Sequence, residues 1–269
     1  MKTAVTLCRV PESAAGPFVF HDPLPESFAK AAAHGFDAVE LFLEGPDAVP
    51  AEEIQALQQQ HGLAIAAVGT GSGMVKHGLS LTDPSPETRK AALDFLLRMI
   101  GFGGRFGAPA ILGSMQGKWS AGVTRVKALD LLAGSLQIAG KAAAACGVPF
   151  IYEPLNRYET NLFNHFGAAA EFLDQREISN VVLLADLFHM SIEERDVAAA
   201  LRAGASRLGH VHWADSNRHA MGLGHTDPAP IMAVLREISY SGYVSAEVLP
   251  LPDPDTAARQ TLQSLIALR

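Results

Sequence analysis

The chain contains two cysteines, Cys8 and Cys146, which lie far apart and form no CxxC spacing. A disulfide framework or a thiolate zinc site needs several cysteines at short intervals, so neither is expected. Two isolated cysteines are typical of a reduced cytosolic setting, and we expect a cytoplasmic protein.

Positive charge and long apolar runs are also scarce. Lys and Arg number 21 against 28 Asp and Glu, and the net charge is −7. A nucleic-acid-binding protein normally presents a basic face, so this balance argues against a nucleic acid partner. No segment approaches the roughly 18 uninterrupted apolar residues of a membrane helix. The first apolar run is broken by Thr6, Arg9 and Pro11, which makes it too short and too polar for a signal peptide.

The chain does contain a regular alternation of two kinds of segment. Of its 269 residues, 48% are hydrophobic, which is enough for a large core. Short β-branched runs predict strands, and the Ala- and Leu-rich segments between them predict helices. The expected strands cover residues 3–10, 36–43, 63–69, 108–113, 148–153, 181–186, 207–213 and 242–248. The expected helices cover residues 25–34, 50–61, 86–106, 122–146, 165–177, 192–203, 228–239 and 254–268.

Boundary signals support this alternation. Gly35, Gly62 and Gly147 each follow a helical segment and precede a strand, as a helix-terminating glycine does. Eight strand–helix units in series with short return connections predict an α/β protein with a (β/α)8 TIM barrel. We expect a single domain over residues 1–269. The longest loops after strands lie near residues 70–85, 154–164 and 214–227.

Reactive groups of this fold gather at the carboxyl ends of its strands. Four successive predicted strands end there in a residue that can bind a metal: Glu153, Asp186, His212 and Glu247. Three carboxylates and an imidazole suit a divalent cation such as Mn²⁺, Mg²⁺ or Co²⁺. Without a cation, converging carboxylates would repel one another and resist ionisation. The second strand also ends in an acid, Glu40.

Four segments in the second half of the chain carry a resemblance to a known family. They are IYEPLNRYETNLFN at 151–164, ADLFHM at 185–190, HVHWADSNR at 210–218 and AEV at 246–248. These segments resemble the ketose 3-epimerases, the branch of the xylose isomerase-like TIM barrels that includes the D-tagatose and D-psicose 3-epimerases. The family spacings hold together: six residues from Glu153 to Glu159, three from Asp186 to His189, and six from His212 to Arg218.

The resemblance implies a role for each of these residues. The four strand-end residues would bind the cation, with Mn²⁺ the first choice. Glu153 and Glu247 would also act as two bases on opposite sides of the substrate. The substrate contacts implied are Glu159, His189, Arg218 and Glu40, and Glu40 either touches a sugar hydroxyl or only orients the site.

The implied reaction inverts C3 of a non-phosphorylated ketose or keto-aldonate. One base removes the proton α to the C2 carbonyl, and the other returns a proton to the opposite face of the resulting cis-enediolate. A cation beside the carbonyl would stabilise the developing negative charge. Relatives of this kind are commonly dimers or tetramers, so a homodimer or homotetramer is expected.

Some features leave alternatives open. Ala214 and Asp215 stand where better-known members often have Gly-Glu, which leaves the substrate open between a neutral ketose and a keto-aldonate. An aldose–ketose or hydroxypyruvate-type isomerase on the same fold is the main alternative. An apurinic endonuclease would need further zinc-binding histidines and a basic groove, and a non-catalytic sugar-binding barrel would not need both bases. Trp119 and Trp213 are expected near the mouth, where aromatic walls commonly line sugar sites, and His210 is expected to be a partner of the metal site or a buried histidine.

Overall fold

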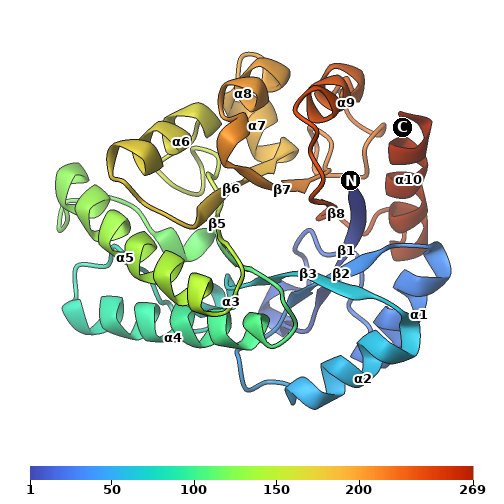
Figure 1. The fold of residues 1–269 in the computed structure, drawn as a ribbon, viewed down its shortest axis with the longest axis horizontal. Coiled ribbons are helices and arrows are strands. Elements are labelled where there is room, and N and C mark those ends of the chain that lie inside the picture. Colours follow the sequence, from blue (N-terminus) through green and yellow to red (C-terminus); the bar gives the residue numbers. More distant parts are fainter. Residues whose placement is uncertain (269) are drawn as a thin grey trace.

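The computed structural model describes residues 1–268, which form a closed barrel of eight parallel strands surrounded by helices (Figure 1). The strands follow one another around the barrel in chain order, and the last pairs with the first. They are β1 (Lys2–Cys8), β2 (Ala38–Phe42), β3 (Ala64–Gly69), β4 (Ala110–Leu112), β5 (Phe150–Tyr152), β6 (Val181–Asp186), β7 (Leu208–His212) and β8 (Tyr243–Ala246). The predicted single-domain (β/α)8 barrel is confirmed, and the strands differ from the expected ones only at their ends.

The helices pack around the outside of the barrel (Figure 1). They are α1 (Leu24–His34), α2 (Ala51–His61), α3 (Ser72–Val75), α4 (Pro86–Gly104), α5 (Arg125–Ala145), α6 (Phe166–Gln175), α7 (Leu187–Glu193), α8 (Val197–Ala203), α9 (Pro228–Glu237) and α10 (Pro254–Ala267). Short 3-10 helices cover η1 (Pro11–Ser13), η2 (Ser114–Gln116) and η3 (Ala205–Arg207). Gly35, Gly62 and Gly147 adopt left-handed backbone angles, as their positions after helices predicted.

One helical prediction was wrong in detail. A single helix was expected over residues 192–203, but the segment after β6 forms two helices, α7 and α8. Asp186 explains the early start, because its Oδ1 accepts a hydrogen bond from the backbone N–H of Phe188 and caps α7. Asp196 caps α8 in the same way through the N–H of Ala199. The segment therefore forms two helices, and each begins at its own capping aspartate.

The barrel interior changes from apolar to polar along the strands. Side chains alternate across a strand, so every second residue points inward. From the amino ends to the middle of the strands, the interior holds small clusters of Ala4, Ala38 and Ala66, and of Ala67, Ile111, Ile151 and Leu184. Towards the carboxyl ends the next inward positions are polar and buried: Thr6, Glu40, Asp186, His210, His212 and Ser245. The apolar layers close the floor beneath a polar site.

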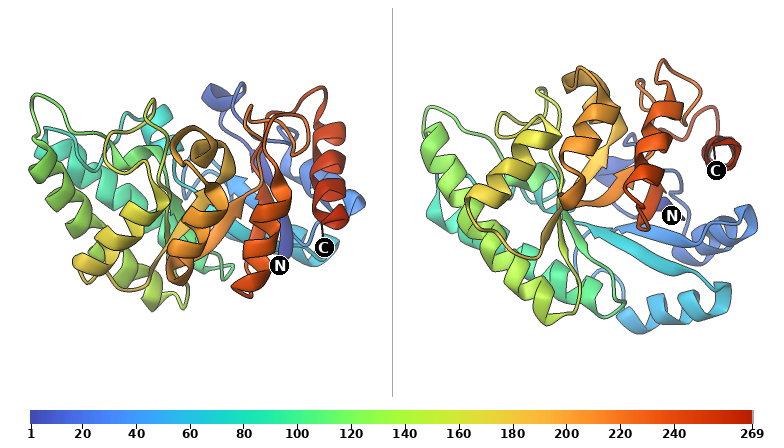
Figure 2. Two further views of the ribbon diagram at one scale, coloured as in Figure 1. Left: turned by 90° about the horizontal axis from the view of Figure 1, so that it is seen from above. Right: turned by 45° about the horizontal axis from the view of Figure 1, so that its top comes forward.

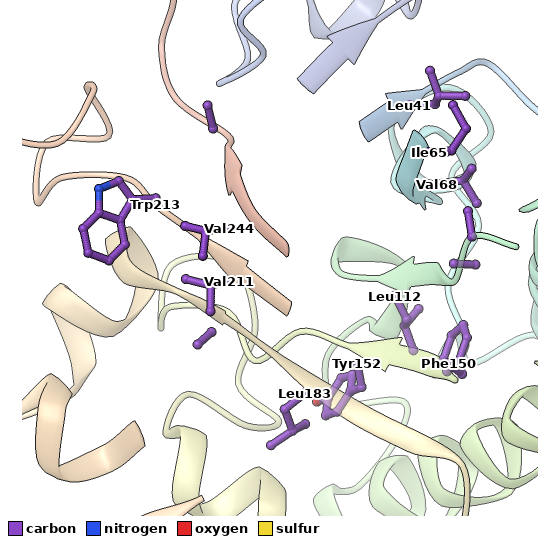
Figure 3. Close-up of a cluster of buried hydrophobic side chains, with 14 of the residues drawn as sticks. Leu41, Ile65, Val68, Leu112, Phe150, Tyr152, Leu183, Val211, Trp213 and Val244 are labelled. Carbon is purple, nitrogen blue, oxygen red and sulfur yellow. The ribbon is translucent and has the colours of Figure 1, made fainter. Parts of the chain in front are cut away.

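The outward-facing strand residues form the main hydrophobic core with the helices. Figure 3 shows buried side chains of this core on successive strands, including Leu41 of β2, Tyr152 of β5 and Val211 of β7. Trp213 lies in the same core directly after β7, fully buried, and its Nε1–H donates to Ser264 Oγ. This shell fixes where each strand ends, and therefore where each strand-end side chain points.

The loops at the carboxyl ends of the strands build the mouth of the barrel. The long segment between β1 and α1 stands at this rim, visible as the dark blue loop at the top of the left panel of Figure 2. Among residues 1–268, no helix combines the length and the apolar character that crossing a membrane requires.

Candidate metal and active site

The structure brings the four predicted metal ligands together. Glu153 directly follows β5, Asp186 and His212 are the last residues of β6 and β7, and Glu247 directly follows β8. One ligand atom from each residue lies within 4.8 Å of each of the others. The strand register explains the proximity of two of them, because Asp186 pairs directly with His212.

The donor atoms of this cluster fit a cation better than they fit one another. Asp186 Oδ2 and His212 Nδ1 are buried, lie 3.5 Å apart and have no hydrogen-bond partner. Glu247 Oε2 lies 3.3 Å from His212 Nδ1, and Glu153 Oε1 lies 3.8 Å from it. Buried polar atoms without partners are costly, so a group that satisfies all of them at once is expected. Carboxylate oxygens with one imidazole nitrogen suit Mn²⁺, Mg²⁺ or Co²⁺.

The charges around the cluster also favour a bound cation. Burial and a neighbouring carboxylate raise the pKa of Glu153 well above its usual range. Burial alone would lower the pKa of His212, but the carboxylates of Glu247 and Glu40 raise it well above its ordinary value. Burial would raise the pKa of Asp186, yet the imidazoles beside it hold that pKa well below its usual range. The excess of carboxylate attracts positive charge to this point, whether from a proton or from a metal ion.

Glu40 lines the same cavity, but both of its oxygens already contact histidines. Oε1 lies 3.1 Å from His212 Nε2 and Oε2 lies 2.8 Å from His210 Nε2. With Glu40 accepting at Nε2, the Nδ1 of His212 keeps its lone pair directed at the ligand cluster. These two contacts support the alternative in which Glu40 orients the site, and His210 is the second histidine that Glu40 contacts. Its contact with substrate stays a prediction.

Gly113, directly after β4, lets Glu153 reach the cluster. A Cβ at position 113 would lie 2.6 Å from Glu153 Oε2, well inside contact distance. The backbone at the end of β4 therefore lies directly against the Glu153 carboxylate. Position 113 requires glycine because the Glu153 carboxylate approaches the backbone there so closely. This requirement was not apparent from the sequence.

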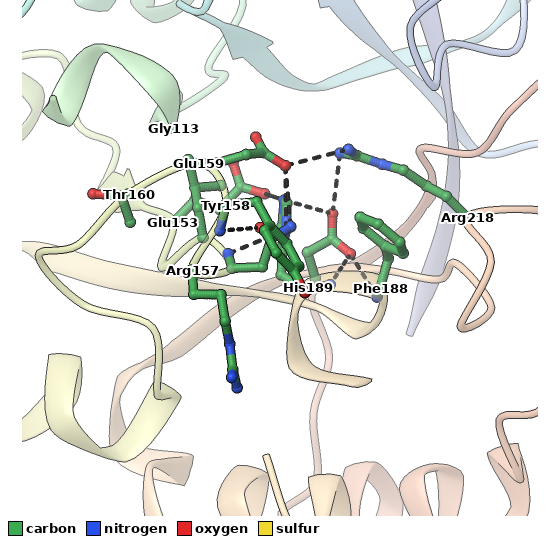
Figure 4. Close-up of polar contacts among 12 residues, drawn as sticks. Gly113, Glu153, Arg157, Tyr158, Glu159, Thr160, Phe188, His189 and Arg218 are labelled. Atoms are coloured by element: carbon green, nitrogen blue, oxygen red, sulfur yellow. Dashed lines mark hydrogen bonds and ion pairs between the residues drawn. The ribbon is translucent and has the colours of Figure 1, made fainter. Parts of the chain in front are cut away.

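His189 is held so that one ring nitrogen faces the cavity. The Asn156 side-chain amide donates to His189 Nδ1 at 2.7 Å, which leaves the Nε2–H for the cavity side. That Nε2 is buried without a hydrogen-bond partner, 3.7 Å from Asp186 Oδ2 and 3.8 Å from Glu153 Oε1 (Figure 4). Asn156 also donates to Glu159 Oε1 at 3.1 Å, which links the two predicted substrate contacts.

Arg218 reaches the site from the loop after β7 (Figure 4). Its Nη2 donates to Glu247 Oε2 at 3.0 Å, its Nη1 lies 3.7 Å from Glu159 Oε1, and its guanidinium lies 4.7 Å from the ring centroid of Phe188. Its backbone adopts a left-handed φ of 62°, which costs energy for a residue with a side chain and is typical of functional sites. Arg218 therefore bridges the metal cluster and Glu159.

Asp215 holds the loop that carries Arg218. Its carboxylate, fully buried, accepts backbone N–H bonds over 2.7–2.9 Å from four residues: Ser216, Gly222, Gly224 and Thr226. Burial raises the pKa of Asp215, but these four bonds outweigh it and lower the pKa to about 2. The backbone N–H of Arg218 also donates to the Asp215 carbonyl. The sequence singled out Asp215 as a departure from the family, and the structure gives it a structural role.

The site opens into one cavity of about 410 Å³. Glu153, Glu159, His189, Arg218 and Glu247 line it, together with Glu40 and His212. Neither tryptophan lines it, contrary to expectation. Trp213 belongs to the outer core, and Trp119 is 41% exposed with its Nε1–H bonded to the Asn161 carbonyl. The aromatic wall comes instead from two residues that the sequence analysis missed, Phe18 and Phe42.

Comparison with known proteins identifies the family of the chain. The xylose isomerase-like TIM barrel family model matches residues 28–268. The D-psicose 3-epimerase of Ruminiclostridium cellulolyticum is 31% identical over 227 residues, 81% of this chain and 75% of that protein. The L-ribulose 3-epimerase of Methylomonas sp. is 31% identical over 228 residues, 82% and 77% of the two chains. In fold, the crystal structure of 3-keto-D-glucoside 4-epimerase from E. coli matches with a TM-score of 0.82 at 24% identity, covering 99% of this chain and 100% of that one.

The chain belongs to the xylose isomerase-like TIM-barrel family. Within that family it groups with the ketose 3-epimerases, and it is a carbohydrate epimerase of the isomerase class.

Proposed function

We propose that the protein is a metal-dependent epimerase that inverts C3 of a non-phosphorylated ketose or keto-aldonate. The observation that carries this proposal is the placement of two carboxylates, Glu153 and Glu247, in one buried cluster. They come from β5 and β8, strands that are not neighbours, and both line the same cavity. A planar intermediate held between them would be exposed to a base on each face.

Glu153, Asp186, His212 and Glu247 would hold the cation. When bound, a divalent ion such as Mn²⁺ supplies the positive charge that polarises the C2 carbonyl and stabilises negative charge on its oxygen. Glu40 orients His212 for this purpose through the contact at Nε2.

The protein side chains carry out the proton transfer. One carboxylate removes the C3 proton, the electron pair of the C–H bond forms the C2–C3 double bond, and the C2 carbonyl becomes a cis-enediolate oxygen. The other carboxyl group, which starts in its protonated form, then donates its proton to C3 from the opposite face and becomes a carboxylate, and the C2 carbonyl forms again. The Nε2–H of His189 and the guanidinium of Arg218 face the cavity, where they donate hydrogen bonds to the oxygens at the C1–C2 end.

An aldose–ketose isomerase on the same fold would move a proton between C1 and C2. The relatives named epimerases do not favour that alternative. The two reactions are distinguished by NMR of D-fructose and D-psicose incubated in D₂O with the Mn²⁺-loaded protein. Deuterium at C3 with formation of the epimer is expected, whereas deuterium at C1 alone would refute the proposal.

The two-base mechanism is tested by Glu153→Gln and Glu247→Gln. Each change removes a proton acceptor with little change of shape, so both variants should lose turnover. Glu53→Gln is the matched control, because Glu53 is exposed on α2, far from the cavity lining. Bound Mn²⁺ is measured in every variant by elemental analysis. Retained epimerisation in either active-site variant would exclude the two-base mechanism.

A further inference from the structure

The cavity is divided into two parts of different chemistry. The ends of β5–β8 and the segments after them contribute the charged and titratable groups of the reaction, except for Glu40, which lies on β2. The opposite part, which we call the distal half, is built by the loops after β1–β4. Its lining residues are Glu12, Ser13, Ala15, Gly16, Pro17, Phe18, Phe42, Gly69, Thr70, Gly71, Val75 and Ser114. A substrate whose reacting carbons lie between Glu153 and Glu247 therefore extends its other end towards the distal half.

An aromatic surface forms one wall of the distal half. The rings of Phe18 and Phe42 stack with their centroids 4.4 Å apart and their planes 23° apart. Gly69 and Gly71 lie against the Phe42 ring, since a Cβ at either position would approach it to 3.0 Å or less. The absence of side chains at these two glycines keeps the ring flat against the strand ends and the cavity open beside it.

The distal half has no positive charge. Among its described lining residues none is Lys, Arg or His, and Glu12 is its one ionisable side chain. The nearby Lys76 forms an ion pair with Glu44, and Arg9 donates to the carbonyl of His21. A carboxylate or a phosphate at this end of the substrate would lie near the like charge of Glu12 without a cation to compensate.

Hydroxyl groups lie beside the aromatic surface. The side chains of Ser13 and Ser114 line the distal half, and neither makes a side-chain hydrogen bond within the described residues. Glu12, Ala15 and Val75 line the same part and are exposed, so the distal half opens to the surface of the protein. An aromatic face bordered by unused hydroxyls and one acceptor carboxylate matches the two sides of a sugar ring, which has apolar C–H faces and polar edges.

We propose that the distal half binds a second, uncharged sugar ring, so that the preferred substrate is a ketose that carries a neutral glycosyl group at its distal hydroxyls. This inference rests on the proposed C3 epimerisation and narrows its substrate class. A keto-aldonate and a sugar phosphate are disfavoured, because each would place an anion beside Glu12. The cavity volume of about 410 Å³ falls in the size range of sites for drug-sized ligands, which a disaccharide resembles.

The test uses four ketoses that share the reacting end of D-fructose and differ at C6. They are D-fructose, 6-O-α-D-glucosyl-D-fructose, D-fructuronate and D-fructose 6-phosphate, and C3 deuterium exchange is followed for each with the Mn²⁺-loaded protein. We expect kcat/KM for the glucosyl ketose to exceed that for D-fructose by about fivefold to tenfold, the size of an added aromatic contact. The two anionic ketoses should react more slowly than D-fructose.

The outcomes separate the two proposals. Exchange at C3 of D-fructose with a slower glucosyl ketose, or with an anionic ketose fastest, would overturn the distal-half inference and leave the epimerase proposal intact. Absence of C3 exchange in all four would refute the epimerase proposal, and the inference would fall with it.

Two variants test the residues that carry the inference. Phe18→Ala should lower kcat/KM for the glucosyl ketose more than kcat/KM for D-fructose and so remove the preference, and Phe106→Ala, outside the cavity lining, is the control. Glu12→Lys should raise kcat/KM for D-fructuronate relative to D-fructose, whereas Glu12→Gln should do so less. Because Glu12 is exposed on η1, these changes spare the fold. An unchanged preference in both Phe18→Ala and Glu12→Lys would show that the distal half does not contact the substrate.

Discussion

Replacing Asp215 with Asn should destabilise the protein in a pH-dependent way. The Asp215 carboxylate is fully buried and accepts hydrogen bonds from four backbone N–H groups of its loop. Burial raises the pKa of this carboxyl, but the four bonds outweigh burial and lower the pKa from its ordinary value of 3.8 to about 2. An amide at this position offers one neutral acceptor oxygen and places an NH₂ group against backbone donors.

The magnitude follows from the pKa difference. Lowering the pKa from 3.8 to about 2 corresponds to about 2 kcal/mol of unfolding free energy at neutral pH. The independent expectation for a charged group that loses its hydrogen bonds is about 1.5–3 kcal/mol, which agrees. Because the pKa is lower in the folded state, the stabilisation is present above pH 3.8 and is lost as the pH falls towards 2.

Urea unfolding followed by circular dichroism measures the effect. At pH 7, Asp215→Asn should unfold with about 2 kcal/mol less free energy than the wild type, and the difference should shrink as the pH is lowered below 4. Asp94→Asn is the matched control, because the exposed ion pair of Asp94 with Lys90 contributes about 0–1 kcal/mol. An equal stability of wild type and Asp215→Asn at pH 7, or a difference that does not change with pH, would refute the reasoning.

Three further predictions concern the metal cluster. Glu40→Gln weakens the acceptor for the Nε2–H of His212, so Mn²⁺ affinity measured by calorimetry should fall about 10- to 100-fold, and an unchanged Kd would show that Glu40 does not orient the ligand. Gly113→Ala places a methyl group 2.6 Å from Glu153 Oε2, so kcat should fall about 100-fold with an unchanged melting temperature, and a normal kcat would contradict the close approach. Burial raises the pKa of Glu153, so Mn²⁺ binding must displace a proton from this side chain. The affinity for Mn²⁺ should therefore decline on acidification, beginning above the pH range in which an ordinary Glu titrates. A Kd that stays constant down to that range would argue against a raised pKa of Glu153.

The metal cluster was predictable because it depends on two regularities of the fold. Strand ends can be located from apolar runs, and barrel closure brings the carboxyl ends together whatever the details of packing. Glu153, Asp186, His212 and Glu247 therefore met as expected. The orienting contacts of Glu40 were not predictable, because they depend on which atoms of β2 and β7 face one another across the interior. That geometry includes an irregular register between β2 and β3 at Val39 and Glu40.

The aromatic wall was missed for a different reason. Tryptophans were taken as the natural lining of a sugar site, but Trp213 sits on the outward face of its strand and fills the core. Phe18 lies in a loop without periodicity, so nothing in the sequence indicated that it folds back onto Phe42. Loop residues far from regular elements are placed by tertiary contacts, which a sequence pattern does not encode.

The two parts of the cavity come from different parts of the sequence. The four proposed metal ligands and the predicted substrate contacts Glu159, His189 and Arg218 come from residues 153–247, and Glu40 of β2 joins them from the first half of the chain. The lining residues of the distal half come from residues 12–114. The two sets follow different strands of the barrel, so the loops at the substrate end can change while the strand ends that position the proton transfer are kept. For this chain, the second half of the sequence therefore indicates epimerisation, and we expect Phe18, Phe42 and Glu12 of the first half to determine which ketose is epimerised.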